Sequence, residues 1–142
     1  MKNKLLLVLF WFVQLTWGLL ENLIASLIFL ALFATGHKPK RFHQMVYFEI
    51  GENWGGFNAG FVAVVNKNVS ERTLRHEHGH FIQTFMFGPF QIFIQIASAA
   101  RYWYREYIYR TDPMKYTMLP DYDSIWFEGQ ATRLGYKYLT RK

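Results

Sequence analysis

The apolar stretch at residues 5–34 constrains the fold of this chain more than any other feature. As one helix it would reach roughly 45 Å, more than the ~30 Å hydrocarbon core of a bilayer, so it must tilt, bend near Gly18 or protrude. The alternative is a cleaved signal peptide, because the chain begins Met-Lys-Asn-Lys. The apolar run exceeds the roughly 7–15 residues of a signal-peptide core. We therefore expect a retained transmembrane helix over residues 5–34.

Two polar residues, Glu21 and Asn22, lie near the middle of this stretch. A carboxylate at such a depth is costly and should face protein or water. Either the pair forms hydrogen bonds between helices or it lines a substrate cavity. The first interpretation is slightly favoured.

The basic residues of the chain stand beside its apolar segments. The formal net charge is +6, which permits either nucleic acid or anionic lipid as a partner. The placement favours the lipid bilayer and predicts no nucleic-acid binding. The cluster Lys38–Arg41 predicts that the active site faces the cytoplasm. The basic positions are Lys2, Lys4, residues 37–41, Arg101, Arg105 and Arg110.

Residues 42–66 have the composition of a β-hairpin beside the helices. Residues 42–50 and 57–65 are rich in Val, Phe and Tyr, and the turn-forming residues 51–56 lie between them. Gly60 within the second strand indicates a bulge or a close backbone approach.

The second half of the chain predicts two helical regions. Residues 70–100 form a helix and an apolar segment kinked at Gly88-Pro89, and residues 124–139 form a final helix. Between them, the aromatic and basic residues of 101–110 are typical of a membrane interface and less so of a surface for single-stranded nucleic acid. The expected fold is a mainly α membrane protein, a single membrane-embedded domain over residues 1–142 with one or two membrane helices.

The motif that predicts chemistry is His76-Glu77-His78-Gly79-His80, which contains His-Glu-x-x-His. On a helix, positions i and i+4 lie on one side, so His76 and His80 can reach one metal ion. Glu77 can then act as general base on a water activated by Zn²⁺. The chain has no cysteine, which excludes thiolate ligands and a cysteine nucleophile.

A third metal ligand is expected in the C-terminal part of the chain. Glu128 is favoured because a helix holds a ligand more firmly than a loop does. Asp121 and Asp123 remain alternatives. The candidates for stabilising an oxyanion, left open by the sequence, are His37, His43, Tyr122 and Tyr136.

These residues resemble the gluzincin metallopeptidases. In that family the third ligand is a glutamate on a later helix, often in Glu-x-x-Ala-Asp, and residues 128–131 match the first four positions. Thr132 stands in place of the aspartate, which in the family supports a ligand histidine. A threonine hydroxyl accepts a hydrogen bond more weakly.

The wider pattern is similar to small bacterial membrane proteins that look like metallopeptidases. The Leu-Asp-Gly motif of site-2 proteases is missing. The matching pieces are residues 16–18, 54–56, 76–83, 88–89 and 128–135.

The predicted activity is therefore hydrolysis of peptide bonds in a peptide or membrane-protein substrate, with Zn²⁺ as cofactor. The alternative is a non-catalytic metal-binding subunit of a membrane-protein complex. The two hypotheses differ in whether Glu77 is needed for proteolysis.

Overall fold

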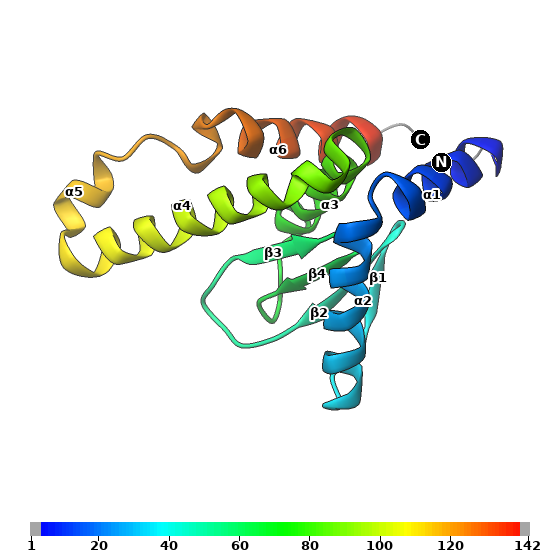
Figure 1. The fold of residues 1–142 in the computed structure, drawn as a ribbon. Coiled ribbons are helices and arrows are strands. Elements are labelled where there is room, and N and C mark those ends of the chain that lie inside the picture. The colour runs from blue at the N-terminus through cyan, green and yellow to red at the C-terminus, as the bar shows by residue number, and fades with distance from the viewer. Residues whose placement is uncertain (1–3, 140–142) are drawn as a thin grey trace.

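A computed structural model describes residues 4–139 and shows a mostly helical protein with one small sheet (Figure 1). The strands are β1 (Lys40–Phe42), β2 (Met45–Glu49), β3 (Gly56–Ala59) and β4 (Val62–Val65). The helices are α1 (Lys4–Thr16), α2 (Leu19–Ala34), α3 (Glu71–Phe87), η1 (Gly88–Phe90), α4 (Gln91–Thr111), α5 (Pro113–Thr117), η2 (Tyr122–Ser124) and α6 (Trp126–Leu139).

The apolar stretch expected to form one helix is divided into α1 and α2, which meet at an angle of 88°. The bend lies at Gly18, one of the three predicted ways to accommodate the length. Asn22 stabilises it, because its Nδ2 donates to the carbonyl oxygens of Gln14 at 2.8 Å and Gly18 at 2.9 Å. With 13 and 16 residues, neither helix alone reaches across a hydrocarbon core of ~30 Å.

The predicted hairpin over residues 42–66 is wrong in its pairing. The sheet has four strands in the order β1-β2-β4-β3, and β2 pairs with β4 in parallel. A turn at Gly60, which has φ +50°, divides the second predicted strand into the antiparallel pair β3 and β4. The β4 strand takes a central place in the sheet because all four of its residues are buried, a pattern typical of a strand covered on both faces.

Helices cover both faces of this sheet. Ala63 and Val65 of β4 pack in one cluster with Leu74 and Phe81 of α3. The alternate β4 residue Val62 packs in a second cluster with α2. The sheet therefore packs against α3, the helix with the His-Glu-x-x-His motif, and fixes its position.

Helix α3 begins at a Ser70 cap, whose hydroxyl accepts a hydrogen bond from the Thr73 amide at 3.1 Å. The predicted kink at Gly88-Pro89 is a single 3-10 turn, η1. Helix α4 then continues to Thr111, beyond the predicted end at residue 100. Together the three elements form a 41-residue helix, Glu71–Thr111, that is long and apolar enough to cross a membrane.

Large apolar side chains remain exposed along α1, α2 and the first half of α4. Contiguous apolar surface of this kind marks a contact with lipid or with another protein. In the second half of α4, four aromatic side chains of the predicted interfacial segment are exposed, namely Trp103, Tyr104, Tyr107 and Tyr109. The basic residue Lys2, predicted to flank the first helix, lies outside the described residues. The exposed apolar residues include Leu5, Val8, Phe12, Leu23, Leu27, Leu30, Phe90, Phe93 and Ile96.

Helix α6 returns alongside α3 (Figure 1). Two glycines permit this approach. A Cβ atom built on Gly79 would overlap the carbonyl of Ala131, and one built on Gly135 would overlap the carbonyl of Arg75. The two backbones are therefore in direct contact, and this brings the first turn of α6 beside the metal motif.

Candidate metal centre

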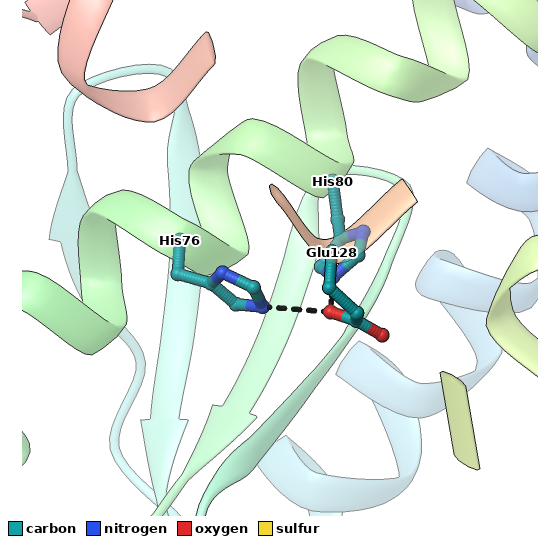
Figure 2. Close-up of side chains that lie close together, drawn as sticks. All are labelled: His76, His80 and Glu128. Atoms are coloured by element: carbon teal, nitrogen blue, oxygen red, sulfur yellow. Dashed lines mark hydrogen bonds and ion pairs between the residues drawn. The ribbon is translucent and has the colours of Figure 1, made fainter. Parts of the chain in front are cut away.

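Three side chains from two helices converge on one point (Figure 2). His76 and His80 project from the same side of α3, and Glu128 projects from α6. The Oε2 atom of Glu128 lies 3.1 Å from His76 Nε2 and 3.2 Å from His80 Nε2. The three residues thus form a group that can hold a metal ion.

The separations of these atoms are slightly shorter than those of the ligand atoms in a tetrahedral metal site. In a tetrahedral site with bonds of about 2.0–2.2 Å, neighbouring ligand atoms lie roughly 3.3–3.6 Å apart. The nitrogen-to-oxygen separations of 3.1 and 3.2 Å are close to that range, and all three ligand atoms lie within 4.8 Å of one another. Small movements would allow the three residues to bind one ion.

The hydrogen bond on the far side of His80 fixes which of its nitrogens faces the centre. Gln83 Nε2 donates to the Phe127 carbonyl at 2.8 Å, so Gln83 Oε1 is an acceptor. This oxygen lies 2.8 Å from His80 Nδ1, which must then donate to it. A neutral His80 therefore presents the lone pair of Nε2 to the centre.

The same logic applies to His76. Its Nδ1 lies 2.8 Å from the Thr132 hydroxyl, and that hydroxyl donates to Asp123 Oδ2 at 3.0 Å. A hydroxyl has a single proton, so His76 Nδ1 is the donor to Thr132. The neutral ring again presents an Nε2 lone pair to Glu128.

Two nitrogen lone pairs and a carboxylate oxygen repel one another unless positive charge lies between them. That charge is either a proton on each Nε2 or a metal ion. Burial raises the pKa of Glu128, but when each Nε2 atom carries a proton, hydrogen bonds from His76 and His80 outweigh burial and hold the pKa well below its usual range. Glu128, which is fully buried, is therefore an anion, the form that binds a cation.

The predicted general base, Glu77, is buried beside this centre and 4% exposed. Its Oε2 atom has no hydrogen-bond partner within residues 4–139. The backbone of β3 comes close to it, because a Cβ atom built on Gly56 would lie 3.0 Å from Glu77 Oε1. An unpartnered buried carboxylate oxygen is costly, and a water or substrate group would satisfy it.

Tyr122, one of the predicted oxyanion candidates, lies next to the centre. Its hydroxyl donates to Glu128 Oε1 at 3.4 Å and lies 3.3 Å from the Ser98 hydroxyl. Burial and the charge of Glu128 raise the pKa of Tyr122, so the phenol keeps its proton. Its single proton points to Glu128 Oε1, and it would have to turn away from Glu128 to reach a bound ligand.

A cavity of about 570 Å³ opens over these residues. Its walls are β3 with the preceding loop on one side and α4 on the other. Five aromatic side chains line the cavity, together with His76, Glu77 and His80 of α3. The aromatic lining residues are Trp54, Phe57, Tyr102, Trp103 and Tyr122.

The other predicted site residues lie elsewhere. His43 is in the turn between β1 and β2, with its ring 6.0 Å from that of His78, and His37 is beside Thr35 after α2. Tyr136 lies over Arg75 at 5.3 Å on the outer part of α6. Of the alternative ligands, Asp123 contacts Thr132, and Asp121 is exposed without joining the metal group.

The hydrogen bond between Gln83 and His80 was not predicted from the sequence. A signal was present, because Gln83 follows His80 by three positions and so lies on the same helix face. The role of Asp123 as a hydrogen-bond partner of Thr132 had no such signal, since it depends on how the loop before α6 folds back.

No protein-family model matches this chain, and neither a curated protein nor a solved structure is similar enough to count as a match. The resemblance to gluzincins therefore stays a prediction from the motif residues.

Proposed function

We propose that this protein is an integral-membrane zinc metallopeptidase. The observation that carries the proposal is the convergence of His76 Nε2, His80 Nε2 and Glu128 Oε2 beside Glu77, whose Oε2 atom has no hydrogen-bond partner among residues 4–139. Two imidazoles and one carboxylate are a donor set typical of catalytic zinc, and three protein ligands leave a coordination position open.

A bound Zn²⁺ ion supplies a Lewis acid that polarises a peptide carbonyl and makes a water more acidic. Glu77 Oε2 takes one proton from the attacking water as its oxygen bonds to the carbonyl carbon. The same carboxyl group gives this proton to the amide nitrogen as the carbon–nitrogen bond breaks, so the products are a carboxylic acid and an amine. The Tyr122 hydroxyl, which donates to Glu128 Oε1 in the structure, turns its proton to the oxyanion as this charge develops.

The edge of the sheet offers a way to align the substrate. β3 is the outermost strand beside the cavity, and within the described part of the chain no further strand pairs with its free edge. An extended peptide can add to such an edge through main-chain hydrogen bonds. We propose that the substrate is an unfolded segment of a peptide or membrane protein.

The membrane assignment rests on the exposed apolar side chains of α1, α2 and α4, together with the helix Glu71–Thr111. The basic residues that follow α2 favour a cytoplasmic active site. Because the chain has no cysteine, a single cysteine at the exposed Lys38 would report this directly. In intact cells, a membrane-impermeant thiol reagent should leave this cysteine unlabelled. Labelling from outside would show that residue 38 faces the exterior and would contradict a cytoplasmic active site.

The test of the enzyme is Glu77→Gln in the full-length protein purified in detergent. Metal analysis should show about one zinc per chain in both proteins, while cleavage of a mixture of unstructured peptides, read by mass spectrometry, should be lost in the variant. The matched control is Glu71→Gln, an exposed carboxylate on the same helix. If neither protein cleaves peptides yet both bind zinc, the non-catalytic metal-binding subunit is the better interpretation.

A further inference from the structure

We propose that Asp123 is a positioning residue of the metal centre, acting on the ligand His76 through the hydroxyl of Thr132. This inference rests on the proposed metal centre. The carboxylate of Asp123 reaches Thr132 from the turn that precedes α6.

The geometry forms an ordered chain of hydrogen bonds. His76 Nδ1 donates to Thr132 Oγ1 at 2.8 Å, and Thr132 Oγ1 donates to Asp123 Oδ2 at 3.0 Å. A carboxylate that accepts the hydroxyl proton makes the hydroxyl oxygen a better acceptor for the imidazole. The imidazole is thereby held in one orientation, and its Nε2 atom becomes a more basic metal ligand.

The fold explains how a loop residue reaches this position. The turn η2 packs directly on the first turn of α6, because a Cβ atom built on Gly129 would lie only 2.6 Å from the Asp123 carbonyl. Gly129, which follows Glu128 in the chain, has no side chain, and this lets Asp123 lie against Thr132. The Oδ2 atom that accepts the Thr132 hydroxyl also lies 3.8 Å from Arg72 Nη2.

The Thr132–Asp123 hydrogen bond could instead have only a structural role, and the two roles lead to different expected results. If the Thr132–Asp123 hydrogen bond only fastened the turn to α6, its loss would lower stability without changing the metal affinity of the folded protein. If it supports His76, its loss weakens metal binding while the fold is retained. Metal affinity and thermal stability therefore need to be measured on the same variants.

The experiment is a Co²⁺ titration of the metal-free, full-length protein in detergent, followed by the visible absorption of the bound ion. Asp123→Asn and Thr132→Val should each weaken Co²⁺ binding by roughly 10–100-fold. Because the two residues act in series, the double variant should bind no more weakly than the single ones. Asp121→Asn, in the same loop, is the matched control and should bind as the wild type does.

A rescue variant separates support of His76 from a general effect of charge. In the Asp123→Asn background, Thr132→Asp places a carboxylate directly against His76 Nδ1 and should restore most of the lost affinity. Without metal, the ¹⁵N shifts of the His76 ring should report a proton on Nδ1 in the wild type and weaker hydrogen bonding there in Asp123→Asn.

Wild-type affinity in Asp123→Asn would overturn the proposal, as would losses that multiply in the double variant or a failed rescue. Each of these results leaves the metal centre intact, whereas a wild-type protein that binds no Co²⁺ would overturn the centre itself and this inference with it.

Discussion

Gly79 and Ala131 are in backbone contact, and no side chain fits between them. A Cβ atom on Gly79 would occupy the space of the Ala131 carbonyl group. Gly79 lies between the candidate ligands His76 and His80 on α3, and Ala131 is three residues after the candidate ligand Glu128 on α6. The contact therefore sets the distance between the two helices at the point where their ligands meet.

Replacing Gly79 by alanine should separate α3 from α6. Overpacking costs about 1–3 kcal/mol, and here it opposes the gain of up to about 1 kcal/mol that alanine gives to a helix. We expect a lower thermal unfolding temperature together with weaker metal binding. Gly55→Ala is the control, because its added Cβ would lie at an ordinary 3.6 Å from Tyr102. Unchanged metal binding in Gly79→Ala would contradict this account of the centre.

Replacing Glu128 by glutamine removes the anionic ligand and keeps the shape of the side chain. The loss of zinc affinity should exceed the roughly 10–100-fold that loss of an outer hydrogen-bond partner costs. Equilibrium dialysis against zinc buffers measures it. Glu106→Gln is a suitable control, because Glu106 forms its ion pair with Arg110 on the outer part of α4. Equal zinc binding in Glu128→Gln would exclude Glu128 as a ligand.

Replacing Tyr122 by phenylalanine tests its proposed hydrogen bond to the oxyanion. Loss of one such donor lowers kcat by roughly 100–1000-fold, and the zinc content should stay the same. The control is Tyr136→Phe, the other tyrosine that the sequence offered for this role, which lies over Arg75. If the two variants have the same kcat, Tyr122 does not contribute to the chemistry.

Replacing Asn22 by alanine should destabilise the bend between α1 and α2. Asn22 Oδ1 accepts the Phe61 amide at 3.1 Å, and the substitution leaves this amide without that acceptor as well as removing the Nδ2 bonds at the bend. We expect a loss of about 1–3 kcal/mol in the free energy of unfolding. Ser26→Ala should cost less, because the Ser26 hydroxyl bonds only within its own helix, to the Asn22 carbonyl. If Asn22→Ala and Ser26→Ala lose the same free energy of unfolding, contacts other than those of Asn22 stabilise the bend.

A cysteine at Leu27 distinguishes a bilayer-facing surface from a water-facing one. Leu27 is 68% exposed, so in a soluble protein this cysteine would react quickly with a polar maleimide. In membrane vesicles, we expect almost no reaction until detergent and denaturant are added, since thiols in hydrocarbon do not meet the reagent. Lys38→Cys in permeabilised vesicles provides the reactive reference. Rapid labelling of Leu27→Cys in vesicles would contradict the membrane proposal.

The elements that follow from local pattern were predictable, and the long-range pairings were not. The helix carrying residues 76–80, the break at Gly88 and the helix carrying Glu128 were all expected from the sequence. The sheet was predicted as a simple hairpin, because nothing local shows that Val62–Val65 lies between two other strands. The 88° bend at Gly18 is stabilised by Asn22 contacts, one of which reaches the sheet.

The sequence by itself determined the chemistry of the candidate centre. A helix must place His76 and His80 on one side, and the sequence favoured Glu128 as the third ligand, with Asp121 and Asp123 as alternatives. Tertiary structure decided the rest. The glycine contacts of α3 and α6 set where Glu128 lies, and the turn before α6 brings a carboxylate to Thr132. Helical periodicity acts over a few residues, whereas these contacts join residues far apart in the chain or depend on the path of a loop.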